Sequence, residues 1–217
     1  KRQALPGVVA YVLIVCAVAW LAGYSFFGAN WFAAGRVDGT LIRDGEWWRT
    51  ITALTLHSGV RHLLGNLVFG VFFGIFAGRL LGSGVAWLAV VVAAALGNTA
   101  NTLLLESTHR SIGASTAVFA TLGLLAGYVW RGQLMAQDRW STGFGPVVGC
   151  LALLMFSGTG DEITVIGAHL MGFVCGFAVG MLMTVVGRMP APARVQYAAG
   201  GAAVGLVALA WLLALHG

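Results

Sequence analysis

The sequence predicts an all-α protein that crosses a membrane about seven times as a helical bundle. Hydrophobic residues make up 59% of the chain and charged residues only 9%, with a mean hydropathy of +0.89. Soluble domains carry about 25% charged residues. A span needs about 20 mostly apolar residues, so this chain has room for about seven spans with their loops. Strands are excluded at membrane depth because an open sheet edge in lipid leaves backbone groups unpaired.

Apolar stretches bounded by charged residues, Gly or Pro place the spans along the chain. The expected ranges are 7–27, 62–80, 85–105, 113–130, 145–158, 164–187 and 195–215. The fifth follows Pro146 and is short. All seven are expected to be helices packed in one membrane bundle.

The long connection over residues 28–61 is predicted to lie at the membrane surface. Its aromatic residues Trp31, Phe32, Trp47 and Trp48 alternate with charged residues. Aromatic rings of this kind prefer the lipid headgroup layer. Trp48 and Arg49, just before the second span, are expected to hold a structured loop in place.

The distribution of charge predicts the orientation, because cytoplasmic segments are enriched in Lys and Arg. With the N-terminus inside, the inner segments carry a net charge of +6 and the outer segments −1. We therefore expect a cytoplasmic N-terminus and a C-terminus on the outer side. The basic residues stand singly between apolar stretches and form no patch, which argues against nucleic-acid binding.

No metal or cofactor is expected. Cys16, Cys150 and Cys175 lie singly in apolar stretches. They show neither CxxC spacing nor a neighbouring group of metal ligands.

Polar side chains at membrane depth are costly, so each one marks a candidate site or a contact between helices. His57, His62 and Asn66 lie before or at the outer end of the second span, Ser115 at that of the fourth, and His169 at that of the sixth. His62 and Asn66 are four residues apart and share a helix face. Taken singly, such a Ser can bond its own helix and such a His can join two helices.

Glycines on the fourth and sixth spans predict that these two helices pack closely. The glycines are Gly123, Gly127, Gly172, Gly176 and Gly180. Small residues let helix backbones approach each other. If these faces meet, Ser115 and His169 reach hydrogen-bond distance, which is the nucleophile and base pairing of acyl transfer. His62 and Asn66 would then be donors to an oxyanion.

Four motifs together resemble the rhomboid family of intramembrane serine proteases. They are Trp48–Arg49, His62-x-x-x-Asn66, Gly113–Ala114–Ser115 and Gly167–Ala168–His169-x-x-Gly172. The similarity extends over roughly residues 8–187 and includes the long first loop and the short fifth span. It implies a rhomboid-like, six-helix catalytic membrane domain over residues 1–187. Residues 188–217 then form a linker and an additional C-terminal helix, a 6+1 arrangement.

The resemblance implies an intramembrane serine endopeptidase. Ser115 is the implied nucleophile and His169 the general base of a dyad, with His62, Asn66 and the Ser115 backbone N–H holding the oxyanion. Transmembrane protein substrates would enter laterally from the lipid between spans 2 and 5, past Phe69, Phe72, Phe73 and Phe76. The implied location is a bacterial plasma (inner) membrane, with the site opening toward the outer face.

Two residues depart from the family pattern. Thr116 replaces the Gly that usually follows the nucleophile, and its bulk is expected to narrow the substrate pocket or to alter helix packing. Phe119 replaces a Tyr whose ring stacks on the catalytic His. We expect Gly113, Ala114, Thr116 and Phe119 to shape the site. The departures leave open a catalytically inactive rhomboid-like protein that binds transmembrane clients, and the intramembrane histidines alone would also suit a transporter or channel.

Overall fold

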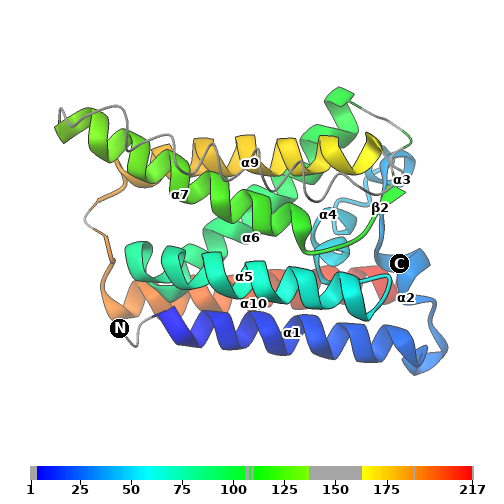
Figure 1. The fold of residues 1–217 in the computed structure, drawn as a ribbon. Helices are drawn as coiled ribbons and strands as arrows, with labels where there is room; N and C mark the ends of the chain where they lie inside the picture. The colour runs from blue at the N-terminus through cyan, green and yellow to red at the C-terminus, as the bar shows by residue number, and fades with distance from the viewer. Residues whose placement is uncertain (1–3, 106–107, 109, 137–162, 188, 217) are drawn as a thin grey trace.

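The computed structural model describes residues 4–105, 108, 110–136, 163–187 and 189–216 as a bundle of long helices (Figure 1). The long helices are α1 (Leu5–Gly23), α5 (Val60–Leu81), α6 (Ser83–Ala100), α7 (Ser115–Ala136), α9 (Ile163–Met183) and α10 (Ala193–His216). A π-helical turn, η4 (Asn101–Leu105), extends α6. These helices coincide with six of the expected spans, while the expected span 145–158 lies outside the described residues.

Among the described residues, five helical stretches are long and apolar enough to cross a membrane. They are Leu5–Gly23, Val60–Leu81, Ser83–Leu104, Ile166–Met183 and Ala193–His216. The prediction of an all-α multi-span membrane bundle is confirmed.

Helix α7 is the interior helix of the bundle and packs against α5, α6 and α9. Its side chains from Val118 to Leu124 are all buried. A helix that is covered on all sides can carry polar residues that lipid would not tolerate. Thr121, for example, donates its hydroxyl to the Ala117 carbonyl of its own helix at 2.7 Å.

The expected glycine contact between α7 and α9 is confirmed. A Cβ on Gly123 would overlap the Phe173 carbonyl, and a Cβ on Gly176 would overlap the Ala120 carbonyl. The two backbones therefore touch through the missing side chains. This approach brings the first turn of α7 against α9 near His169 and Gly172.

The long connection between α1 and α5 is a compact cap of short elements. They are η2 (Phe26–Gly28), α2 (Trp31–Gly35), β1 (Val37–Asp38), α3 (Gly39–Arg43), α4 (Arg49–Thr52) and η3 (Ala53–Thr55). Strand β1 pairs antiparallel with β2 (Arg110–Ser111), just before α7. Figure 1 shows this cap at the end of the bundle that also holds the C-terminus, while the N-terminus lies at the opposite end.

Arg49 holds the cap together, as expected from its position. Its side chain is buried and donates to the carbonyls of Ala33 (2.8 Å) and Arg36 (3.2 Å) and to the Glu46 carboxylate (2.6 Å). The expectation that the aromatic residues all lie at the membrane surface is wrong for Trp31. That ring is only 4% exposed, because it packs against Trp211 of α10, whereas Trp47 is 44% exposed.

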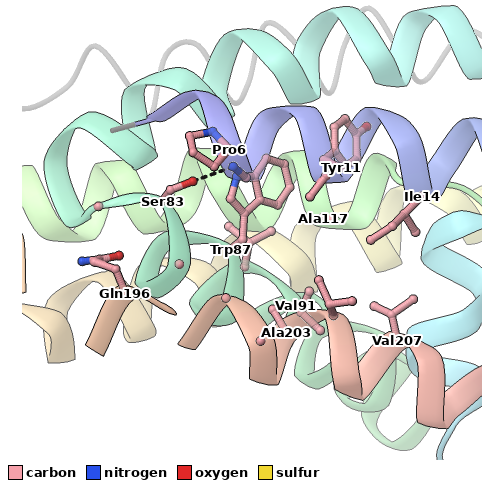
Figure 2. A pocket seen from close by; sticks show the side chains of 18 of the residues that line it. Pro6, Tyr11, Ile14, Ser83, Trp87, Val91, Ala117, Gln196, Ala203 and Val207 are labelled. Carbon is pink, nitrogen blue, oxygen red and sulfur yellow. Dashed lines mark hydrogen bonds between the residues drawn. The ribbon is translucent and has the colours of Figure 1, made fainter. Parts of the chain in front are cut away.

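A cavity of about 510 Å³ lies between α1, α6 and α10 (Figure 2). Its walls are mainly apolar and include Trp87 of α6 and Val207 of α10. At one end Ser83 accepts a hydrogen bond from the Gly7 amide at 2.7 Å, which joins the start of α6 to α1. Helix α10 is thus separated from α1 along the cavity.

Candidate active site

Ser115 and His169 meet at the cap end of the contact between α7 and α9. Ser115 is the first residue of α7, and His169 lies in the second turn of α9. The distance from His169 Nε2 to Ser115 Oγ is 2.8 Å. The imidazole is only 3% exposed. A serine hydroxyl bonded to a buried imidazole is the geometry in which a base can take the hydroxyl proton.

Gly113 opens a space between Ser115 and His62. Its φ is +127°, and a Cβ built there would lie 2.6 Å from His62 Nε2 and 3.5 Å from Ser115 Oγ. A point with these distances to a nucleophile and to a ring nitrogen is where a reacting carbonyl oxygen can sit. The absence of a side chain at Gly113 keeps this point free.

The hydrogen bonds of His62 indicate which ring nitrogen carries the proton. The Ser58 backbone N–H donates to His62 Nδ1 at 3.5 Å, and the Ser58 hydroxyl lies 3.2 Å from the same atom. With Nδ1 as the acceptor of these Ser58 groups, we assign the hydrogen of the neutral ring to Nε2. That N–H faces the space beside Gly113 and is suited to donate to a negative oxygen.

Asn66 lies one turn after His62 on the same helix and is buried. The side-chain amide nitrogen of Asn66 donates to the backbone carbonyl of His62 at 3.2 Å. The backbone carbonyl of Asn66 accepts from the Tyr11 hydroxyl at 2.9 Å. The side-chain NH₂ carries two hydrogens, so Asn66 has a second hydrogen that it can donate. The structure thus brings Ser115, His169 and His62 together, with Asn66 one turn further along α5.

The expected fourth span begins too early, because α7 starts at Ser115 and not at residue 113. The first helical hydrogen bond runs from the Val118 N–H to the Ala114 carbonyl at 2.9 Å. The N–H groups of a first turn have no partner inside the helix, and the helix dipole makes this end favourable for negative charge. The Ser115 N–H therefore belongs to a turn that suits an anion.

His57 organises the approach to this turn, a role that the sequence did not reveal. It is buried, and its Nε2 accepts from the Ala114 N–H at 3.4 Å while Nδ1 lies 3.3 Å from the Thr55 carbonyl. Burial, with a contribution from neighbouring His62, lowers the pKa of His57 from 6.5 to about 4. The ring is therefore neutral near pH 7 and can accept. Its position five residues before His62 was the only signal.

Phe119 and Thr116 take up different positions around the site. The Phe119 ring stacks on the His169 imidazole, with centroids 4.5 Å apart and planes at 21°. Thr116 is buried toward α9, where its carbonyl and Cγ2 lie 2.7 and 3.0 Å from the point where a Gly172 Cβ would stand. Of the two expected effects of Thr116, this contact favours altered helix packing, and Gly172 makes room for it.

The phenylalanines of α5 differ in exposure. Phe72 is 54% exposed and Phe76 43% exposed, whereas Phe73 packs against Phe119 and Leu122 of α7. The expected lateral entrance also involves span 5, which lies outside the described residues. Within the described ranges, no group of three or more His, Cys, Asp or Glu side chains is placed to hold a metal ion.

Comparison with known proteins identifies the family. Residues 44–186 match the family model described as Rhomboid domain. "Rhomboid-like protease 1" of Toxoplasma gondii is 31% identical over 160 residues, which are 72% of this chain and 51% of that protein. "Rhomboid protease GluP" of Bacillus subtilis (strain 168) is 38% identical over 93 residues, or 43% of this chain and 18% of that protein.

A second Bacillus subtilis (strain 168) protein matches over more of its length. "Putative rhomboid protease YdcA" is 28% identical over 183 residues, which are 81% of this chain and 87% of that protein. The chain therefore spans about half the length of the Toxoplasma relative and most of this one.

Proposed function

Because this chain belongs to the rhomboid family, we propose that it is an intramembrane serine endopeptidase that hydrolyses peptide bonds in or near transmembrane segments of other proteins. The observation that carries the proposal is the 2.8 Å hydrogen bond between Ser115 Oγ and His169 Nε2 at the cap end of α7. The protease names of the relatives support the same class of activity.

In the first half of the reaction, Ser115 Oγ attacks the carbonyl carbon of the scissile peptide bond. His169 Nε2 takes the hydroxyl proton as the new C–O bond forms. The carbonyl oxygen becomes an oxyanion held by the Ser115 N–H, the His62 Nε2–H and the Asn66 amide. Protonated His169 then gives its proton to the leaving amine, and the C–N bond breaks to leave an acyl-enzyme.

In the second half, water attacks the acyl-enzyme. His169 takes a proton from the water, the oxyanion forms again in the same place, and the ester bond to Ser115 breaks as its Oγ regains the proton. The products are a free carboxylate and the resting enzyme. Donors that are already oriented toward the oxyanion stabilise it more than water does, because they need not reorganise.

Transmembrane protein substrates are proposed to reach Ser115 from the side, out of the lipid. The exposed rings of Phe72 and Phe76 on α5 support an apolar surface that a substrate helix can contact. Water is proposed to reach the site from the cap end, where Ser115 and His62 are only partly buried.

We further propose that the cap faces the outside of a bacterial plasma membrane and that the N-terminus is cytoplasmic, as the charge distribution favours. In a variant without native cysteines, Ser25→Cys, just after α1, and Arg194→Cys, in the first turn of α10, offer two exposed positions. Figure 1 shows the end of α1 and the start of α10 at opposite ends of the bundle. A membrane-impermeant maleimide added to intact cells should label only the first. Labelling of the second alone would reverse the orientation.

A fluorophosphonate probe tests the activity, because it reacts with a serine whose hydroxyl is activated by a base. Wild-type protein in native detergent should be labelled and should cleave a transmembrane substrate. Ser115→Ala should lose both, while Ser25→Ala, a serine in the connection after α1, should keep both. An unlabelled wild-type protein beside a labelled active rhomboid protease would refute the proposal.

The alternative is an inactive rhomboid-like protein that binds transmembrane clients. It was motivated by Thr116 and Phe119, but Thr116 contacts α9 at Gly172, and the Phe119 ring stacks on His169. Neither contact removes the hydrogen bond between Ser115 and His169. The alternative predicts client binding without cleavage in the wild-type protein, and equal behaviour of Ser115→Ala.

A further inference from the structure

Trp211, near the end of α10, is buried in the cap that precedes α5. It is 7% exposed, and its indole N–H donates to Thr55 Oγ1 at 3.0 Å. The ring lies against Trp31, with centroids 4.6 Å apart. A Cβ on Gly35 would stand 2.5 Å from its Cη2 atom, so the ring fits closely over that backbone. The large ring and the paired N–H together define one position for this side chain.

Thr55 connects Trp211 to His57. The Thr55 hydroxyl that accepts from the indole donates to the Thr52 carbonyl at 2.7 Å. The Thr55 carbonyl in turn lies 3.3 Å from His57 Nδ1, and His57 Nε2 accepts from the Ala114 N–H. Three hydrogen bonds, joined through the Thr55 residue and the His57 ring, therefore connect α10 to the residue before Ser115.

A second bond holds the same backbone from the same segment. The Gly113 N–H donates to the Ala53 carbonyl at 2.9 Å. Both amides that precede Ser115 are thus bound by residues 53–57. The direction of the Ser115 N–H and Oγ follows from the backbone at these two residues.

Burial makes these bonds difficult to replace. Thr55 is 5% exposed, His57 6% and Ala114 1%. When one partner in such a series is removed, the remaining buried group loses its hydrogen bond and must stay unpaired or move. A shift of the chain at Ala114 would change the geometry of the nucleophile, and small displacements of a catalytic group are costly.

We propose that Trp211 is a positioning residue for the active site, acting through Thr55 and His57 on the backbone at Ala114. This inference rests on the proposed function, because its consequence for catalysis requires Ser115 to be the nucleophile. It gives α10, expected from the sequence as an additional C-terminal helix, a role at the site. The sequence suggested only an added helix there.

The opposite end of α10 offers a matched control. Gln196 donates from Nε2 to the Leu81 carbonyl at 2.9 Å and accepts from the Val85 N–H at 3.0 Å. Between these bonds and Trp211, α10 borders the cavity of Figure 2, where Gln196, Ala203 and Val207 are drawn. Gln196→Leu therefore loosens α10 far from Ser115, and Trp211→Phe loosens it next to the site.

The experiment compares the full-length wild-type protein with Trp211→Phe, Thr55→Val, the double variant and Gln196→Leu. Trp211→Phe keeps an aromatic ring and loses the N–H, so we expect kcat for a transmembrane substrate to fall about three- to tenfold with KM unchanged. Thr55→Val should give a similar loss. The double variant should be no slower than the slower single variant, because both remove the same bond.

Amide hydrogen exchange at Ala114 gives a readout that needs no activity. It should become about three- to tenfold faster in Trp211→Phe, with Gln196→Leu like wild type in both exchange and kcat although its melting temperature falls. The inference would be overturned if Trp211→Phe had the wild-type kcat and the wild-type exchange rate at Ala114. It would also be overturned if the losses of kcat added up in the double variant, or if Gln196→Leu lost as much kcat as Trp211→Phe. If wild type is not labelled by the fluorophosphonate, the proposed function fails, and exchange at Ala114 alone decides the inference.

Discussion

The ring of Phe119 lies nearly parallel to the imidazole of His169, with centroids 4.5 Å apart. The two residues come from α7 and α9, so the stacking depends on the glycine contact between these helices. Stacking limits how far the imidazole can turn away from Ser115. The contact therefore supports the orientation of the proposed base.

Phe119→Leu should reduce cleavage about two- to tenfold, because an aromatic pair contributes about 0.5–1.5 kcal/mol beyond its buried area. The measurement is kcat together with the melting temperature. Phe177→Leu is the control, since that ring contacts Trp130 and Phe173 on the same pair of helices. Phe177→Leu should lower the melting temperature by a similar amount but leave cleavage normal. An equal loss of cleavage in both variants would contradict an orienting role of Phe119.

Gly113→Ala should abolish fluorophosphonate labelling, because the new methyl group would stand between His62 Nε2 and Ser115 Oγ. Gly45→Ala is the matched control. Both glycines have positive φ, +127° and +108°, but a Cβ on Gly45 meets nothing within 4 Å. Each substitution should cost about 1–3 kcal/mol of stability from backbone strain. Normal labelling of folded Gly113→Ala would show that the space beside it is not used.

Gly172→Ala should lower both stability and cleavage, because its Cβ would lie 2.7 Å from the Thr116 carbonyl and force α7 and α9 apart beside the site. Overpacking of this kind costs about 1–3 kcal/mol. In contrast, Gly205→Ala on α10 has nothing within 4 Å and should gain up to about 1 kcal/mol from helix propensity. Thermal unfolding measures the stability of both variants, and a cleavage assay measures their activity. A Gly172→Ala protein with wild-type stability and cleavage would contradict the close contact between α7 and α9.

The stability of the protein should fall as the pH drops from about 6.5 toward 4, because burial, and to a lesser degree His62, lowers the pKa of His57 to about 4. Between these values the unfolded chain binds a proton that the folded chain does not, so the free energy of unfolding rises with pH. The full difference is about 3 kcal/mol. Thermal unfolding at several pH values should show a smaller pH dependence in His57→Gln, and an identical dependence would exclude His57 as its source.

Cleavage should also decrease on acidification, because a protonated His169 cannot accept the proton of Ser115. Initial rates of substrate cleavage across the pH range measure this. A rate that stays flat from about pH 4 to 8 would contradict a neutral histidine base.

Much of the fold follows from sequence patterns that act locally. The ranges expected for α1, α5, α6, α9 and α10 agree with the structure to within a few residues, because lipid requires long apolar helices whatever their neighbours are. The hydrogen bond between Ser115 and His169 was also expected from the sequence, because glycines on two spans predicted that these helices pack closely. The glycine pattern indicates contact because only a missing side chain allows two helices to approach so closely.

The position of Trp31 could not be derived in this way. An aromatic residue in a charged loop suits the membrane surface, but Trp211, 180 residues further along the chain, buries it. The sequence singled out His57 but not its role, for a similar reason. Its partners Thr55 and Ala114 become neighbours only when the cap folds over the start of α7.

By itself, the sequence determined that this protein is a helical membrane bundle and which polar residues lie at one depth, because the solvent preference and spacing of side chains are local properties. Only the tertiary structure decided how those residues are oriented. The open space between Gly113 and His62 and the series of bonds from Trp211 to Ala114 depend on contacts between distant segments. Directional hydrogen bonds take their geometry from both partners, and no single segment contains both.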